Sequence, residues 1–213
     1  MVVPLIVELL VLIIIPVLLI YYRIVPYKYR LKIMVLMTAV VVGIILFEGW
    51  SLERVGLRLD NISSALPAYL LYLLFGSLCI LLLARHLGVK PVKRWWKDPH
   101  FQYFFLLASF FQELVFRGFF IVELQDVVSS SLIVVLLNAL IFTFIHIIYS
   151  VNPQVLFGTF LSGVLFAVVY ISYPNLILIS LTHAMFNFLV VLHGIFTQEH
   201  KETVKPVLET VRV

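Results

Sequence analysis

Three short stretches of the sequence carry side chains that could perform chemistry within a very apolar chain. Glu113 and Arg117 lie four residues apart in "QELVFRG", so they share a helix face and can pair. His183 and Asn187 have the same spacing in "HAMFN", and His146 ends the stretch "FTFIH". Ionisable groups inside membrane spans are rare and face protein or water rather than lipid. We therefore expect four side chains to meet around one shared water-filled pocket: those of Glu113, His146, His183 and Asn187.

These residue types suit the hydrolysis of an amide bond. That reaction needs a base near the attacking water and donors aimed at the developing oxyanion. A histidine and an asparagine amide one helical turn apart can both donate to one oxygen. Taken singly, each feature also has a purely structural interpretation. Glu113 and Arg117 are equally consistent with a buried ion pair that holds helices together. His146 or His183 alone is consistent with an interhelical hydrogen bond, and Asn138 is interpreted in that way.

Two other classes of function are less favoured by the sequence. Glu113, His146 and His183 are residue types that bind zinc, but the spans contain no H-E-x-x-H pair, so we expect no metal and no other cofactor. The single cysteine, Cys79, excludes an internal disulfide and a cysteine-rich metal site, and we expect it to behave as a small hydrophobe. A transporter would show internal repeats or paired broken helices, and neither is visible.

The composition requires a membrane around the elements that position these residues. Of 213 residues, 63% are hydrophobic and only 12% are charged, which leaves too little polar surface to cover a soluble domain. A run of about 20 apolar residues spans a bilayer. The sequence predicts an all-α bundle of about seven to eight transmembrane helices, with no cleaved signal peptide. The seven runs are 4–22, 32–49, 65–84, 101–124, 131–149, 154–172 and 175–197.

The polar groups divide the chain unevenly. Residues 1–100 hold three spans with almost no polar side chain in their interiors, and residues 101–197 hold four spans with all the candidate site residues. Residues 198–213 are expected to form a short cytoplasmic tail. In the sixth run, Gly158 and Gly163 are expected to let a neighbouring helix approach closely.

Basic residues cluster in two loops, "YYRIVPYKYRLK" and "RHLGVKPVKRWWKDPH", which carry nine lysines and arginines against a single aspartate. Both loops fall on one side of the membrane if the spans alternate. The positive-inside rule makes that side cytoplasmic, with the N-terminus outside and the C-terminus inside. Trp95 and Trp96 are interpreted as interface anchors. Because most of the lysines and arginines behind the net charge of +4 lie in these loops, the expected partners are membrane lipids and a protein or lipidated-peptide substrate, not nucleic acid.

The three stretches, taken in order, resemble the CPBP family of CAAX proteases and bacteriocin-processing enzymes, also called the Abi family. The family pattern is E-E-x-x-x-R, then F-x-x-x-H, then H-x-x-x-N or H-x-x-x-D, each on its own transmembrane helix. The resemblance covers about residues 101–197. It implies a metal-independent intramembrane endopeptidase of the glutamate type.

The resemblance also implies a role for each matching residue. His146 corresponds to the histidine that activates water, and His183 and Asn187 correspond to the pair that stabilises the oxyanion. Arg117 occupies the arginine position, and Glu113 that of the second glutamate.

Gln112 stands where the family pattern has its first glutamate. Its amide can orient a water but cannot take a proton from it. Adjacent helix residues point about 100° apart, so Glu113 cannot simply occupy the same place. Four explanations are open: Glu113 acts as the base after a local rotation, His146 is the sole base, the chain is a silent binding or immunity protein, or the glutamine was introduced to trap a substrate. We favour an active enzyme because the other motif positions all match.

Overall fold

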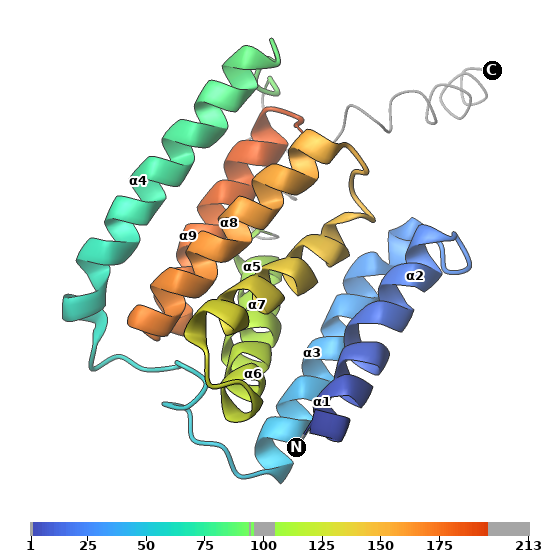
Figure 1. Cartoon of the computed structure of the whole chain (residues 1–213). Coiled ribbons are helices and arrows are strands. Elements are labelled where there is room, and N and C mark those ends of the chain that lie inside the picture. Colours follow the sequence, from blue (N-terminus) through green and yellow to red (C-terminus); the bar gives the residue numbers. More distant parts are fainter. Residues whose placement is uncertain (1, 94, 96–104, 196–213) are drawn as a thin grey trace.

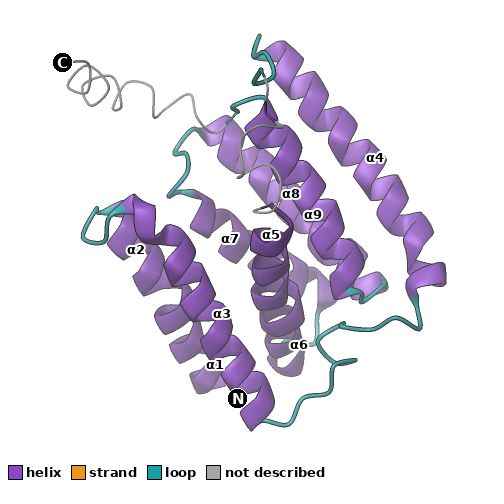
Figure 2. Cartoon of the chain, turned by 180° about the vertical axis from the view of Figure 1, so that it is seen from behind, coloured by secondary structure: helices purple, strands orange, loops and turns teal. Residues whose placement is uncertain are grey.

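The computed structural model describes residues 2–93, 95 and 105–195, and in this part of the chain every regular element is a helix (Figures 1 and 2). The first apolar run forms one rod of α1 (Val2–Glu8), a π-helical segment η1 (Leu9–Ile14) and α2 (Ile15–Tyr21). The fourth run forms a second composite rod, with the π-helical segment η5 between two α-helices. Its parts are α5 (Phe105–Glu113), η5 (Leu114–Ile121) and α6 (Val122–Val127).

The other elements are simple helices. They are the short 3₁₀ turn η2 (Tyr27–Tyr29), α3 (Arg30–Phe47), α4 (Ile62–His86), α7 (Ser131–His146), α8 (Pro153–Ser172) and α9 (Leu176–Leu192). Asparagines begin the last two helices, because the side chain of Asn152 accepts a hydrogen bond from Gln154 N and that of Asn175 accepts one from Leu178 N.

Five helical segments of the described chain are long and apolar enough to cross a membrane, which supports an integral membrane protein. They are Pro4–Tyr21, Tyr27–Phe47, Ile62–His86, Phe105–Val127 and Pro153–Ser172. The apolar helices α7 and α9 are shorter, with 16 and 17 residues. The all-helical class is thus confirmed, whereas the predicted number of seven to eight spans is not confirmed by the five candidate spans and two shorter apolar helices of the described residues.

The rod from α5 to α6 lies at the centre of the arrangement. The α1–α2 rod and α3 pack side by side on one flank, and α4 lies on the opposite flank against α8 and α9 (Figure 1). In the central rod 56% of the apolar window is buried inside the protein, against at most 28% in the other spans. Its polar side chains are therefore shielded from lipid by protein.

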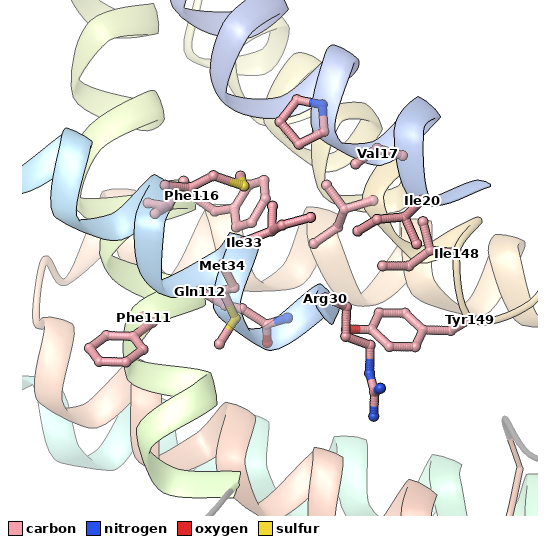
Figure 3. Close-up of a pocket in the computed structure, with 14 residues that line it drawn as sticks. Val17, Ile20, Arg30, Ile33, Met34, Phe111, Gln112, Phe116, Ile148 and Tyr149 are labelled. Carbon is pink, nitrogen blue, oxygen red and sulfur yellow. The ribbon is translucent and has the colours of Figure 1, made fainter. Parts of the chain in front are cut away.

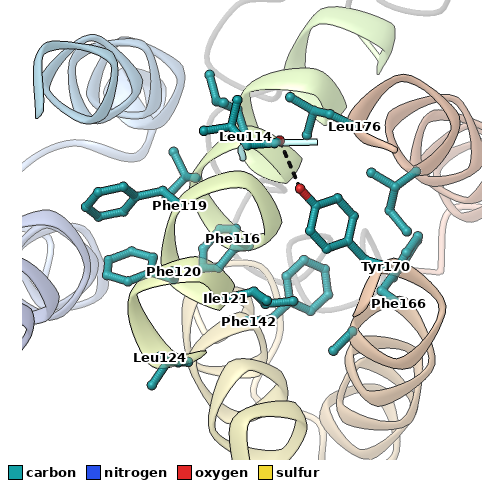
Figure 4. Packing of buried hydrophobic residues seen from close by; sticks show 14 of the residues in the cluster. Leu114, Phe116, Phe119, Phe120, Ile121, Leu124, Phe142, Phe166, Tyr170 and Leu176 are labelled. Carbon is teal, nitrogen blue, oxygen red and sulfur yellow. Dashed lines mark hydrogen bonds between the residues drawn. The ribbon is translucent and has the colours of Figure 1, made fainter. Parts of the chain in front are cut away.

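Aromatic side chains fill the space around η5. Phe116, Phe119 and Phe120 project from it and are almost fully buried (Figure 4). Phe116 meets the ring of Phe142 from α7 edge-on at 5.6 Å, and Phe166 from α8 joins the same cluster. This packing fixes the position of the central rod against α7 and α8.

The loop between α3 and α4 holds the adjoining ends of α8 and α9. Tyr170 donates a hydrogen bond to Val55 O at 2.9 Å, as drawn in Figure 4, and Leu176 N donates to Gly56 O at 2.7 Å. Gly56 has a φ of +73°, and a Cβ there would lie 2.3 Å from the Tyr170 hydroxyl. Only glycine suits this contact, which sets where α9 begins.

The two glycines of α8 behave differently. A Cβ on Gly163 would lie 3.2 Å from Ala139 Cα, which confirms the predicted close approach of α7. Gly158 has no atom within 4 Å of a Cβ position, so the same prediction was wrong for it.

Several predictions lie outside the described residues. They concern Trp96, the basic residues Arg94 and Lys97, residues 101–104 of the fourth run, residues 196–197 of the last run, and the tail 198–213. Trp95 is described, and its ring meets that of Phe188 edge-on at 5.0 Å.

Candidate active site

A carboxylate shared by an imidazole and a guanidinium lies at the junction of α5 and η5. Glu113 Oε1 is 2.5 Å from His183 Nδ1 on α9, and it accepts a hydrogen bond from Arg117 Nη1 at 3.4 Å. Arg117 Nε is 3.3 Å from Glu113 Oε2, so the predicted pairing of these two residues is confirmed. Both side chains have no exposed surface. Because a carboxylate beside a guanidinium only accepts, Nδ1 of His183 carries the proton in this bond.

Aromatic rings supply much of the remaining surroundings of Arg117. The guanidinium carbon lies 4.3 Å from the centre of the Phe142 ring and 5.1 Å from that of Phe166. No hydrogen-bond acceptor reaches Nη2 within the described part of the chain. Ring faces attract a cation most strongly where water is excluded, so the two rings partly replace the missing acceptors. Nearby, Asn138 Nδ2 donates to Phe116 O at 2.7 Å, which confirms the predicted interhelical hydrogen bond.

A second polar bridge joins α5 to α9 one turn away. Ser109 precedes Glu113 by four residues, and Asn187 follows His183 by four, so each pair lies on one helix face. Asn187 Nδ2 donates to Ser109 Oγ at 3.1 Å, and Ser109 is fully buried. Ser109 was not predicted as a site residue, although its position one turn before Glu113 was a usable signal in the sequence.

His146 lies at the end of α7, with its ring oriented by the backbone. Its Nδ1 is 2.7 Å from Phe142 O, and since a carbonyl only accepts, Nδ1 donates this bond. In the neutral ring the lone pair therefore resides on Nε2. The rings of His146 and Phe142 are 4.6 Å apart, as the spacing predicted. The Phe142 ring is also 5.6 Å from that of His183, so it lies close to both imidazoles.

His146, His183 and Asn187 line one cavity of about 330 Å³. Its walls come mainly from α4 and α8 and are largely apolar. Glu113 is not among the lining residues, because its carboxylate is enclosed by its bonds to His183 and Arg117. The prediction of one common pocket therefore holds for three residues and was wrong for Glu113. The walls include Tyr72, Phe75, Gly76, Cys79, Ile80, Leu83, Gly158, Thr159, Leu165, Phe166 and Phe186.

Gln112 lies in a different place. It lines a smaller cavity of about 50 Å³ between the N-terminal helices and the central rod (Figure 3), and only 9% of its surface is exposed. The family position had grouped it with the site residues, but the structure does not bring it to the cavity that holds His146. Glu113 and Gln112 thus face different neighbours, as the 100° turn between adjacent helix residues requires.

The described residues contain no group of three or more His, Cys, Asp or Glu side chains arranged to hold a metal ion. Cys79 has an exposed side chain and faces the large cavity, whereas its sequence context predicted only a packing role.

Fold and site together define an all-helical membrane protein that encloses a polar cluster between its helices. Residues 94–189 match the family described as type II CAAX prenyl endopeptidase Rce1-like. The match covers just under half of the chain; it confirms the resemblance of this segment to the CPBP proteins and supports, at the level of the family, a CAAX-type intramembrane protease. No curated protein and no solved structure matches the chain.

Proposed function

We propose that the chain is an intramembrane endopeptidase in which His146 activates the water, and His183 and Asn187 stabilise the oxyanion. One observation carries the proposal: these three side chains line the same cavity, and each is oriented by a hydrogen bond on the side away from its expected role. A preoriented donor or base needs no reorganisation during the reaction.

The reaction begins when Nε2 of His146 takes a proton from water, whose oxygen attacks the peptide carbonyl carbon. The carbonyl electron pair moves to its oxygen, which accepts hydrogen bonds from His183 Nε2–H and the second N–H of the Asn187 amide. The tetrahedral intermediate then collapses, the C–N bond breaks, and the proton on His146 passes to the leaving amine. Water is thereby added across one peptide bond.

Glu113 and Arg117 serve as positioning residues in this scheme. The Glu113 carboxylate is completely buried, so it contacts neither water nor substrate. It compensates the positive charge that His183 carries when both its ring nitrogens are protonated. Arg117 holds the carboxylate in position, with Nε 3.3 Å from Glu113 Oε2.

The substrate is a membrane-associated peptide with an apolar or lipid-modified segment. The apolar side chains of α4 and α8 in the cavity wall suit such a segment, and the matched family is described as a CAAX prenyl endopeptidase. The basic loops support an N-terminus outside and a cytoplasmic C-terminus.

The test is cleavage of a membrane-anchored peptide library by detergent-purified protein, for the wild type, His146→Ala and His193→Ala. His193 is a matched control, because its Nδ1 also bonds a carbonyl four residues earlier, at 2.8 Å, but it does not line the cavity. His146→Ala is expected to lose on the order of 100- to 10,000-fold in kcat, and His193→Ala to keep wild-type activity. The proposal fails if the wild type cleaves nothing under conditions where an established family enzyme is active.

A second candidate is a catalytically silent protein that binds a lipidated tail or acts as an immunity protein. The placement of Gln112 favours it, since no carboxylate stands at the family's first glutamate position. In that case His146→Ala leaves the cellular phenotype intact, while Gly158→Leu, which fills open space on the cavity wall, abolishes it.

A further inference from the structure

The small cavity lined by Gln112 lies between two parts of the chain. Helices α2 and α3, which lie outside the family match, form one wall, and α5, η5 and the end of α7 form the other. The side chains around it are mostly apolar, such as Ile33, Met34 and Ile148 (Figure 3). This cavity is separate from the one that holds His146 and His183.

Gln112 lines this cavity with an amide side chain. The side chain is about nine-tenths buried, and no hydrogen bond to it is formed by the described part of the chain. An amide that lines such an apolar cavity offers two N–H donors and an acceptor to a ligand. Its position therefore indicates a ligand that brings a polar atom into an otherwise apolar space.

Arg30 gives the cavity a cationic end. It is the first residue of α3 and lies beside Tyr149 at one end of the cavity in Figure 3. Its guanidinium is held by the Tyr27 carbonyl at 3.3 Å and lies 4.1 Å from the centre of the Tyr27 ring. Lys28 and Lys32, which are exposed, lie in the same acid-free segment. The ligand's charged end is accordingly an anion.

The lining residues follow a consistent order along the helices. Met34 and Met37 follow Arg30 on α3 by four and seven residues, or about 6 and 10 Å at 1.5 Å per residue. Gln112 faces the same space from α5, and Phe116 lies one turn further along that rod. Starting from the first residue of α3, the cavity is therefore lined by the Arg30 cation, then by the Gln112 amide, and then by apolar side chains.

We propose that this cavity binds an anionic phospholipid. The phosphate lies on Arg30, an ester carbonyl accepts a hydrogen bond from the Gln112 amide, and an acyl chain continues over the exposed apolar side chains of α3, Leu36 and Val40. The volume of about 50 Å³ holds the ester region only, so the chains remain in the bilayer. A glutamate at position 112 would repel the phosphate and could not donate when ionised, which accounts for a glutamine there. This proposal does not depend on hydrolytic activity.

The test measures lipid retained by the purified full chain after equilibration with vesicles of phosphatidylcholine and phosphatidylglycerol in equal amounts. Wild type is expected to retain phosphatidylglycerol in preference. Arg30→Gln should lower that retention about tenfold, as expected for a charged hydrogen bond, and Gln112→Leu about fivefold. Gln112→Glu should lower it at least as far. Lys28→Gln is the matched control, because it removes an exposed charge from the same segment without touching the cavity, and it should change retention less than twofold.

Three outcomes would overturn the proposal. Equal losses in Arg30→Gln and Lys28→Gln would mean diffuse attraction to basic residues rather than a site. Wild-type retention by Gln112→Leu would show that the amide makes no contact with the lipid. Displacement of the lipid by millimolar glycerophosphate would identify a site for a soluble phosphate. Melting temperatures measured in phosphatidylcholine alone identify any variant that fails to fold. If Gln112→Leu does not fold, Arg30→Gln still tests the site, because Arg30 is the first residue of its helix.

Discussion

Replacement of Glu113 by glutamine gives the sharpest test of the buried polar cluster. Glu113→Gln keeps the shape of the side chain and removes its charge. Arg117 then has no anion although its side chain is fully buried, and His183 loses the group that compensates an imidazolium. Stability and hydrolysis are therefore both expected to fall.

The size of the stability change follows from the burial of the pair. Breaking a buried ion pair by removing one partner costs about 3–5 kcal/mol. The faces of Phe142 and Phe166 remain in place against the guanidinium, so the lower end of that range, about 3 kcal/mol, is expected. For a chain of this size that corresponds to a fall in Tm of roughly 6–12 °C. Loss of the His183 donor should lower kcat on the order of 100- to 1,000-fold.

A double variant separates the structural role from the catalytic one. In Glu113→Leu with Arg117→Met, both buried charges are replaced by apolar groups of similar volume, which is often neutral or stabilising. Its free energy of unfolding should return to within about 1 kcal/mol of the wild-type value while hydrolysis stays lost. Glu123→Gln, on α6 of the same rod and half-buried, is the control for neutralising a carboxylate, and it should leave both quantities unchanged.

Thermal unfolding in detergent and peptide turnover, measured on the same preparations, decide the matter. A wild-type Tm in Glu113→Gln would show that the carboxylate does not balance Arg117. Restored hydrolysis in the double variant would show that Glu113 has no part in positioning His183.

Three further predictions concern other parts of the structure. Ser109→Ala should lower kcat about fivefold with KM unchanged, because it removes the hydrogen bond that orients the Asn187 amide but makes no contact with substrate. A matching rise in KM would contradict this prediction. Gly56→Ala should cost about 2 kcal/mol or more in thermal unfolding, since it combines a positive φ with a clash against Tyr170, whereas Gly43→Ala, with open space around it, should cost nothing. Alkylation of Cys79, which lines the large cavity, by N-ethylmaleimide should block hydrolysis and should be slowed by peptide substrate, whereas Cys79→Ala should resist the inhibitor. Unaltered activity after complete alkylation would show that the cavity takes no part in the reaction.

The helices could be predicted from the sequence, because a helix that crosses the bilayer needs an apolar run of a defined length. The predicted runs 32–49, 65–84 and 154–172 overlap α3, α4 and α8 closely. The two π-helical segments were not predictable, since they change the backbone hydrogen-bond register without altering the apolar pattern. The contacts of Gly56 were missed for a similar reason: a loop that fastens two helix ends leaves no periodic signal.

Spacing of four residues was the most reliable guide to the site. It predicted the pairing of Glu113 with Arg117 and the stacking of Phe142 on His146, because both depend only on helix geometry. It could not show which helix each face meets. The bond from Glu113 to His183, and the removal of Glu113 from the cavity wall, follow from the packing of α5 against α9.

Hydrolysis in water enriched in ¹⁸O, followed by mass spectrometry of the product, tests the central claim most directly. Wild-type protein should release a peptide whose new C-terminal carboxyl group carries one ¹⁸O, and His146→Ala should release almost none. Equal labelled product from both proteins would remove His146 from the reaction, and an absence of product from wild type would contradict the peptidase itself.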